Sequence, residues 1–330
     1  MRTLFNASSS AEAILGLDLA KDSVQAQLQL ASAGKVCFAF ANNPSGFKKL
    51  GHILEQHCVA LVHAGVEATG AYSQPLTCWL HAQGYRVSLL NPRRVRDYAR
   101  SAGLRNKTDA LDAGVIADYV RAQRERLPLW QPPIAEVRQL QELVRRRHQV
   151  DGLLLAERNR LESATATVRS SIERLIEVLG SEKASLEKAM ATQIRAHPQL
   201  LRNQQLLCTI KGIGSLTASV ILAEMATPAQ VQRARQAAAL AGLCPRREIS
   251  GSSVRRNKGM GKEGSRYLRR ALYMPALVAI KHNVPLRHFA QRLQAAGKSE
   301  MAIIGAVMRK LVHISFGVLK HQQPFNPSLA

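Results

Sequence analysis

Several features are scarce in this sequence of 330 residues. Aromatic residues make up only 5%, which argues against recognition dominated by base stacking. The five cysteines are scattered with no CxxC pair, so we expect buried small side chains in a reducing compartment rather than disulfides or a zinc knuckle. Apolar runs such as 271–280 fall far short of the ~20 residues that span a bilayer, and residues 1–11 are polar and lack the apolar core expected of a signal peptide. These absences predict a cytoplasmic protein with no membrane partner.

Acidic residues are also few, because 23 Asp and Glu stand against 46 Lys and Arg, for a formal net charge of +23. A chain with this excess repels itself unless a polyanion neutralises it, so nucleic acid is the expected partner. The apolar content of 46% is enough for globular cores. The length suggests two or three structural units.

The first part of the chain has the pattern of an α/β domain. An apolar run at 13–19 and an alternating stretch at 24–30 predict two antiparallel strands, and further strands then alternate with helical segments. This order predicts a mixed sheet. We assign 13–134 to this domain and 1–12 to a flexible tail.

The middle of the chain, 135–198, predicts a long helix or a helical hairpin. Two series of apolar residues recur every seven positions, which is typical of a coiled-coil seam and favours oligomerisation or an extended arm. An amphipathic helix packed on its own core remains the alternative. A mostly α domain is expected over 199–322, followed by a tail at 323–330. The two series are Leu154, Leu161, Val168 and Leu175, and Ile172, Leu179 and Leu186.

Four carboxylates are candidates for a metal site. Asp18 interrupts an apolar strand, where a charge is costly unless it is paired or bound to a cation. Glu67 ends the next central strand, where open α/β sheets bind ligands. Asp109 and Asp112 share one face at a helix start. Taken singly, each has a plainer interpretation, as a solvated carboxylate or as a complement to the helix dipole. Together they predict Mg²⁺, with Mn²⁺ as the alternative, in phosphodiester chemistry.

Basic residues and glycines suggest where phosphates bind. The Gly212-Ile213-Gly214 turn resembles a helix-hairpin-helix, in which backbone N–H groups approach a phosphate; a simple turn between helices is the alternative. A polar loop follows within 244–270, where nine basic residues oppose two glutamates. On the residues alone, its serines merely donate hydrogen bonds. The candidate nucleic-acid-binding residues are Arg93, Arg94, Arg105, Lys107, Lys211, Gly212, Gly214, Arg246, Arg247, Arg255, Arg256, Lys258, Lys262, Arg269 and Arg270.

These motifs, in this order and over nearly the whole chain, resemble the one-ten family of bacterial insertion-sequence transposases. These are DEDD recombinases guided by a bridge RNA. Two small departures are Lys211, where many relatives have proline, and Gly261, where serine is frequent. The motifs are Gly16-Leu17-Asp18, Glu67-Ala68-Thr69-Gly70, the stretch from Leu104 to Ala113, the Gly-Ile-Gly turn, Ser250-Gly251, Gly264 and Leu268-Arg269.

The resemblance implies a RuvC-like, RNase H-type domain whose Asp18, Glu67, Asp109 and Asp112 are catalytic and bind magnesium. It also implies a C-terminal transposase domain with Ser250 as nucleophile, Ser252 and Ser253 being less favoured neighbours. In such proteins the two sites assemble between protomers, and the coiled coil helps dimers pair into a tetramer.

The activity that the resemblance implies is RNA-guided recombination of double-stranded target and donor DNA. A covalent 5′-phosphoserine would form, in the cytoplasm of a bacterium and near its nucleoid. Two alternatives stay open: a metal-dependent nuclease or resolvase of Holliday-type junctions without serine chemistry, and a non-catalytic nucleic-acid-binding protein.

Overall fold

The computed structural model divides the chain into two compact units, 1–132 and 133–330, and each is described by itself. The finer division into three parts, 13–134, 135–198 and 199–322, and two tails stays a prediction. For residues 109–111, 246–250, 254–258 and 329 the structure describes the backbone but not the side chains. The structure describes residues 12–30, 32, 34–67, 72–103, 109–225, 231–250, 254–261 and 263–329.

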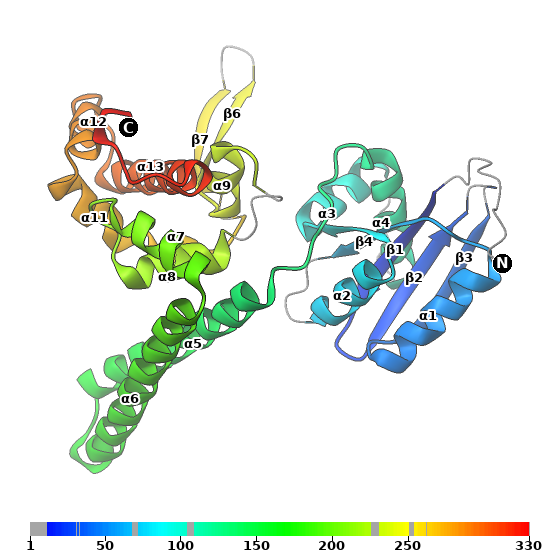
Figure 1. Ribbon diagram of the computed structural model, residues 1–330, viewed down its shortest axis with the longest axis horizontal. Helices are drawn as coiled ribbons and strands as arrows, with labels where there is room; N and C mark the ends of the chain where they lie inside the picture. Colours follow the sequence, from blue (N-terminus) through cyan, green and yellow to red (C-terminus); the bar gives the residue numbers. More distant parts are fainter. Residues whose placement is uncertain are drawn as a thin grey trace. The chain divides into compact units, whose positions relative to one another are not determined.

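The first unit contains a five-stranded sheet in the order β3-β2-β1-β4-β5. Strand β1 pairs antiparallel with β2 and parallel with β4, and β4 pairs parallel with β5. The predicted mixed sheet is therefore confirmed (Figure 1). The elements of this unit are β1 (Ala13–Leu19), β2 (Ser23–Gln29), β3 (Lys35–Ala41), α1 (Pro44–Gln56), β4 (Val62–Glu67), α2 (Gln74–Ala82), β5 (Arg86–Leu90), α3 (Pro92–Ser101) and α4 (Asp109–Gln123).

Helices cover both faces of this sheet, which explains why β1 is apolar at successive positions. Leu15 and Leu17 are fully buried in a core that also contains Leu50 of α1 and Leu76 of α2. Ile14 points to the other face, where it joins a second core with Ile116 of α4. A strand covered on both sides cannot alternate between apolar and polar residues. Asp18 is the one residue of β1 that is only half-buried.

Two glycines let helix α4 lie directly against the sheet. Gly16 of β1 and Gly65 of β4 are partners in the parallel register. A Cβ on Gly16 would collide with the backbone of Ala113 and Ala117, and a Cβ on Gly65 would collide with the Val120 side chain. The close approach of α4 therefore depends on the absence of side chains at these two positions.

Substituting Gly16 by alanine is expected to destabilise the first unit by about 3 kcal/mol, because helix backbone must move to admit the methyl group. The matched control is Gly51→Ala in α1, where the new Cβ would meet only Trp79 at 3.7 Å and alanine favours the helix by up to about 1 kcal/mol. Denaturant unfolding of the two variants measures both changes. Equal stability of the two variants would contradict the close packing at Gly16.

A buried histidine makes this unit sensitive to acid. The Ser88 hydroxyl donates to the Pro128 carbonyl at 3.0 Å, so its oxygen accepts from Nε2–H of His63 at 2.9 Å. Nδ1 of His63 is buried without a hydrogen-bond partner among the described residues. Burial, followed by the charges of Arg86 and Arg124 and against that of Glu12, lowers the pKa of His63 to about 4. Protonation would place a second N–H where nothing accepts it.

We expect this unit to lose roughly 3 kcal/mol of its free energy of unfolding as the pH falls from about 6.5 to about 4. The unfolded chain binds the proton at the ordinary histidine pKa, whereas folded His63 resists it, so the unfolded state gains as acid is added. His63→Gln should remove this part of the pH dependence. His52→Gln, at an exposed position, should leave it intact in the same denaturant titrations. A pH dependence unchanged in His63→Gln would refute the assignment.

The second unit begins with a helical hairpin followed by a mostly helical body. Helices α5 and α6 pack along each other and project from that body (Figure 1). The elements are α5 (Ala135–Glu162), α6 (Ala166–Ala196), α7 (Pro198–Cys208), α8 (Ser215–Glu224), α9 (Ala234–Leu240), β6 (Cys244–Ser250), β7 (Val254–Gly261), α10 (Arg266–Ala271), α11 (Tyr273–His282), α12 (Val284–Ala295), α13 (Glu300–His321) and the short 3-10 helix Pro327–Leu329.

The heptad prediction holds only in part. The long helical segment is confirmed as two long helices, but the turn after Glu162 falls inside the first apolar series, between Leu161 and Val168. The series therefore does not follow one seam, and Val168 and Leu175 are exposed at 47% and 44%. A seven-residue spacing places residues on one face only within a continuous helix, and a turn between two helices breaks that relation.

One further expectation is wrong. The cysteines are not buried: Cys37, Cys58 and Cys208 are exposed, and the other two are half-buried. Helix α13 is long and apolar enough to cross a membrane by length and composition alone, although Arg309 and Lys310 interrupt its apolar runs. Buried residues of α13, such as Val307 and Leu311, belong to the main core of the second unit. Its apolar character is therefore that of a core helix.

Candidate active site and nucleic-acid interface

The strand carboxylates lie at one edge and on one face of the sheet. Asp18 follows Gly16 by two residues and Glu67 follows Gly65 by two residues, and successive side chains of a strand alternate between faces. Both acids therefore share the face on which α4 packs. Because β1 and β4 are parallel, both stand near the carboxyl ends of their strands. This is the edge where α/β sheets place ligands.

Helix α4 brings a third carboxylate towards this edge. Asp112 immediately precedes Ala113, whose backbone lies against Gly16, and it is half-buried. Asp109 is the first residue of α4, with a side chain outside the described set. The backbone thus places the start of α4, which carries the predicted acidic pair, beside the strand that carries Asp18. Both Asp18 and Glu67 have polar partners in the structure.

A hard divalent cation fits this donor set by chemistry, because the candidates are all carboxylates and such cations prefer oxygen ligands. Among the described side chains, however, no three Asp, Glu, His or Cys residues come close enough to hold a metal ion. The side chain of Asp109 is not among those that the structure describes. Asp18, Glu67 and Asp112 therefore share an edge of the sheet without forming a closed cage by themselves.

Helix α3 presents a basic surface. The sequence patterns did not predict that this segment is helical. Its four arginines are exposed, and the one acidic residue of the helix, Asp97, lies 3.9 Å from both Arg93 and Arg100. Residues of α3 and Asn91 line a hollow of about 550 Å³. The helix could have been found from its start, since Asn91 caps it by accepting from the Arg93 N–H at 2.9 Å and Pro92 occupies the first turn. Arginines grouped in this way suit phosphate groups.

The glycine turn lies between two helices of the second unit, α7 and α8. Gly212 has a φ of +110°, and a Cβ there would approach the Pro275 carbonyl oxygen to 2.9 Å. Gly214 is exposed at the N-cap of α8, where no atom of the described residues outside its chain neighbours and its own helix lies within 4 Å of its ideal Cβ position. The exposed Lys211 precedes them. The turn therefore offers a helix N-terminus and a cation to an anion.

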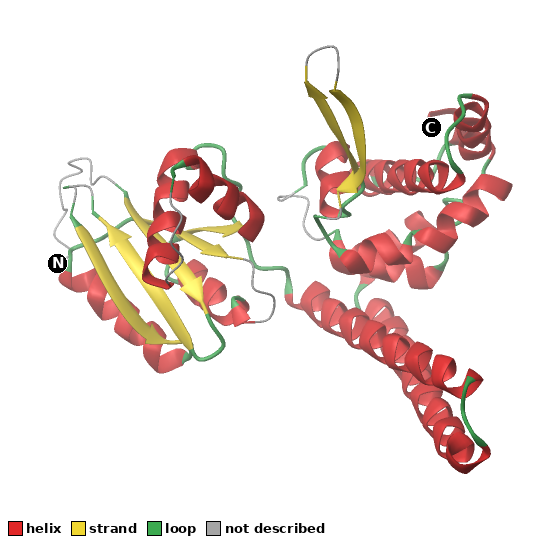
Figure 2. Cartoon of the chain, turned by 180° about the vertical axis from the view of Figure 1, so that it is seen from behind, coloured by secondary structure: helices red, strands yellow, loops and turns green. Residues whose placement is uncertain are grey.

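Two strands flank the serine-rich part of the predicted polar loop, of which 251–253 lie outside the described residues. Strands β6 and β7 pair antiparallel, with Ser250 opposite Val254 at the end next to the tip. Figure 2 shows this hairpin as two arrows that stand out from the helices of the second unit. The sequence analysis did not predict these strands, because they are rich in charge and carry few of the apolar residues that reveal a strand. Ser250 is placed by its backbone alone, as the last residue of β6.

The remaining predicted phosphate contacts divide into three groups. Arg269 is half-buried and donates to the Ala241 carbonyl at 3.4 Å, whereas Arg270 is exposed and forms an ion pair with Asp151 at 2.9 Å. Arg94 is exposed on α3. On the hairpin, only the backbone is described for Arg246, Arg247, Arg255, Arg256 and Lys258. Outside the described residues lie Arg105, Lys107, Lys262, Ser252 and Ser253.

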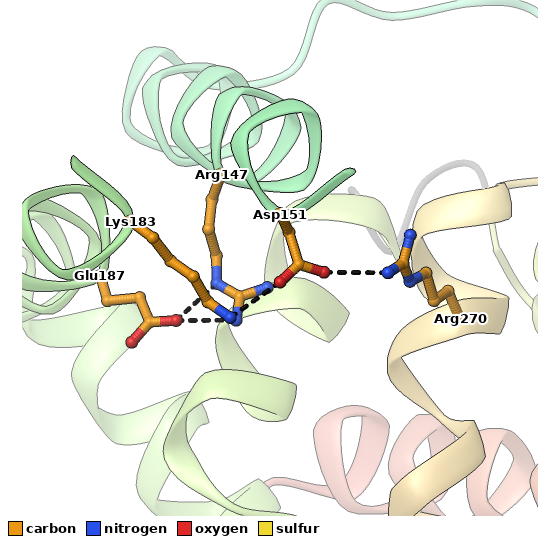
Figure 3. Close-up of polar contacts among 5 residues, drawn as sticks. All are labelled: Arg147, Asp151, Lys183, Glu187 and Arg270. Atoms are coloured by element: carbon orange, nitrogen blue, oxygen red, sulfur yellow. Dashed lines mark hydrogen bonds and ion pairs between the residues drawn. The ribbon is translucent and has the colours of Figure 1, made fainter. Parts of the chain in front are cut away.

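An ionic network joins three helices beside the glycine turn (Figure 3). Asp151 of α5 accepts from Lys183 of α6 at 2.7 Å and from Arg270 of α10 at 2.9 Å. Arg147 and Glu187 pair nearby at 2.7 Å. Burial alone would raise the pKa of Asp151, but the Lys183 hydrogen bond and the surrounding cations lower it overall. Sequence reasoning did not identify this network, because its pairs lie 32, 40 and 119 residues apart in the chain, beyond the reach of any local pattern.

Comparison with known proteins identifies the class of protein to which this chain belongs. Residues 15–168 match a DEDD transposase family and residues 204–291 match the family described as "Transposase IS116/IS110/IS902 family". The first unit is thus the RNase H-like DEDD domain of a transposase, and that class of domain uses divalent metal. The five-stranded mixed sheet with its helices agrees with this assignment.

Full-length relatives narrow the class to one family. The chain is 33% identical over 315 residues to a pilin gene-inverting protein of Moraxella bovis, covering 94% of this chain and 97% of the relative. The corresponding protein of Moraxella lacunata matches equally. A transposase for insertion sequence element IS1111A of Coxiella burnetii is 26% identical over 302 residues, covering 82% and 78%. The chain belongs to the IS110 family of transposases, and it is an enzyme of DNA transposition.

Proposed function

We propose that this transposase is an RNA-guided recombinase that cuts and rejoins double-stranded DNA through a covalent 5′-phosphoserine on Ser250. The observation that carries the proposal is the position of Ser250, which is the last residue of β6, next to the tip of a protruding hairpin. A hydroxyl on such an arm can be presented to a DNA strand. A hydroxyl in the helical core could not.

In the proposed step the Ser250 Oγ attacks the phosphorus of a DNA phosphodiester. A new P–O bond to serine forms, the bond to the 3′-oxygen breaks, and the 3′-oxygen leaves as a hydroxyl after taking up a proton, while the serine proton passes to a base. The phosphoserine ester conserves the energy of the broken bond, so a second 3′-hydroxyl can reverse the reaction on another strand without water. Recombination then needs no external energy source.

Asp18, Glu67, Asp109 and Asp112 would hold Mg²⁺, or Mn²⁺, at the carboxyl edge of the sheet. When bound, the ion supplies Lewis-acid stabilisation of the negative charge that develops on the phosphate oxygens. The shared face of Asp18 and Glu67 and the close approach of α4 support this assignment. The basic residues of α3, the glycine turn and the hairpin would hold the DNA and RNA backbones.

A guide RNA would select target and donor by base pairing, while the protein binds backbone and duplex shape. The net charge of +23 and the scarcity of aromatic residues support this division. Dimers would pair into a tetramer, with apolar side chains on the α5–α6 hairpin such as Val178, exposed at 63%, as the contact. We place the reaction in the bacterial cytoplasm near the nucleoid. Since the relatives from Moraxella are named for pilin gene inversion, inversion of a DNA segment is one outcome of such recombination.

The test begins with the purified protein and the RNA that accompanies it. Sequencing of that RNA should reveal one species whose loops match two DNA sites, and DNA built to match should be recombined with a protein–DNA adduct as intermediate. Recovery of no defined RNA, or recombination independent of it, would overturn the guided mechanism. A junction nuclease is the alternative activity, and it predicts cut products without an adduct.

A further inference from the structure

The second unit contains a pocket that the proposed recombination chemistry leaves without a role. It has a volume of about 240 Å³ and lies where α5, α8, α10 and α11 meet. Apolar side chains including Val144, Leu216 and Pro275 form part of its wall. It is smaller than the roughly 300–1,000 Å³ of sites for drug-sized ligands, so its size suits a single planar group.

Aromatic rings form another part of the wall. His148 and Tyr267 meet edge to face, with ring centroids 4.9 Å apart. The guanidinium of Arg266 lies over the Tyr267 ring at 5.0 Å and that of Arg145 at 5.9 Å. Burial, together with the charges of Arg270 and Arg266 and against that of Asp151, lowers the pKa of His148, which favours the neutral ring. Apolar and aromatic walls of this kind accept a nucleobase.

The rim of the pocket carries a carboxylate held in a fixed position. Asp151 lines the pocket, and Lys183 and Arg270 each donate to one of its two oxygens (Figure 3). An ionised carboxylate has about four lone-pair positions, so each oxygen can accept one more hydrogen. The side chain is 22% exposed. Two parallel acceptors match two adjacent N–H donors, and guanine is the base that offers such a pair, from N1–H and the 2-amino group.

The pocket also adjoins the surface proposed to bind nucleic acid. Leu216 and Thr217, which line it, follow Gly214 by two and three residues on α8. Arg270 at its rim is exposed. A backbone bound at the 211–214 turn would therefore pass close to the opening. A base paired in a duplex cannot enter, whereas an unpaired one can leave the stack at modest cost.

We propose that this pocket binds one unpaired guanine of a nucleic acid held at the glycine turn, with Asp151 reading the Watson–Crick edge. The inference rests on the proposed nucleic-acid contact of that turn and not on the serine chemistry. The guanine can belong to DNA or to RNA, since the site recognises the base itself.

The experiment measures binding of labelled duplexes to the full-length protein by fluorescence anisotropy. Each duplex carries a single bulged guanine, a single bulged adenine or no bulge, and each is prepared as DNA and as RNA. We expect the wild type to prefer the guanine bulge over the adenine bulge roughly tenfold in at least one of the two sets. The salt dependence of binding should be the same for all three duplexes of a set, because the added contact is to a base and not to a phosphate.

Asp151→Asn should abolish the guanine preference while slightly strengthening binding to the duplex without a bulge, because one negative charge is lost. The matched control is Glu187→Gln, which removes a charge from the same network at a residue that does not line the pocket. It should keep the preference. A preference lost equally in both variants would assign the effect to the network and overturn the reading of guanine by Asp151.

A second variant tests the pocket independently, in case Asp151→Asn does not fold. Thr217→Trp fills the pocket from the half-buried Thr217 and should remove the preference for guanine without changing affinity for the plain duplex. A preference that survives in Thr217→Trp, or its absence from wild type in both DNA and RNA, would overturn the proposal. Adduct formation, scored separately, reports on the proposed function, so either idea can fail without the other.

Discussion

Replacing Ser250 by alanine is expected to abolish the covalent protein–DNA adduct and to lower the rate of strand transfer by at least about 10⁴-fold. The substitution removes the oxygen that would bond to phosphorus, and no other group in the reaction can store the ester. Denaturing gel electrophoresis of the protein with labelled DNA detects the adduct, and product formation is followed on the same samples. DNA affinity should stay within a few-fold of wild type, since the change leaves the charge of the hairpin unaltered.

Two neighbours provide matched controls for this result. Ser252→Ala and Ser253→Ala remove a hydroxyl from the same Ser-Gly-Ser-Ser segment and should leave the adduct in place. If Ser250→Ala keeps the adduct and one neighbour loses it, the nucleophile is that neighbour. If Ser250→Ala still cuts DNA at the wild-type rate with no adduct in any protein, the enzyme is a junction nuclease.

Asparagine in place of Asp18 is expected to lower strand transfer roughly 10³-fold. The amide keeps the shape of the carboxylate but gives up the charge that would attract the cation. Thermal unfolding supplies a second readout: Mg²⁺ should raise the melting temperature of the wild type, because a ligand that binds only the folded state stabilises it. That rise should be much smaller in Asp18→Asn. Asp112→Asn should behave in the same way.

The control for these variants is Asp22→Asn, which removes the same charge from an exposed turn directly after β1. It should retain both activity and the response to Mg²⁺. The non-catalytic alternative makes the opposite forecast, namely that Asp18→Asn and Asp112→Asn leave every activity unaltered and that Mg²⁺ acts only by screening charge. Equal Mg²⁺ responses in Asp18→Asn and Asp22→Asn would exclude a metal site at the sheet edge.

The sequence predicts the sheet of the first unit well because the physical signal there is strong. Residues 13–19 form β1 within the predicted bounds, and the alternation after Ser23 matches β2, since one face of β2 is buried. The shared edge of Asp18 and Glu67 also follows from strand order. What sequence cannot supply is the depth of α4 against the sheet, which depends on how Gly16 and Gly65 align in register.

The failures have physical causes as well. Helix α3 has only Val95 fully buried, so its helical period is hidden among arginines. The hairpin strands lack an apolar face for the same reason. The pocket beside the ionic network is assembled from four helices, and no local pattern encodes which distant residues will meet. The local spacing of apolar residues indicates which side chains are buried. Helix α3, the hairpin strands and the pocket depend instead on charge or on tertiary assembly.

The length of the β6–β7 hairpin sets the position and the orientation of the serine that it carries. Each residue of an extended strand advances the chain by about 3.3 Å, and its side chains alternate between faces. Removing a single residue from each strand would turn the hydroxyl to the opposite face, whereas removing two would withdraw it by nearly 7 Å with its orientation kept. Relatives with longer or shorter arms can therefore be sorted by parity: an even difference in arm length keeps the presentation of the serine, and an odd one inverts it.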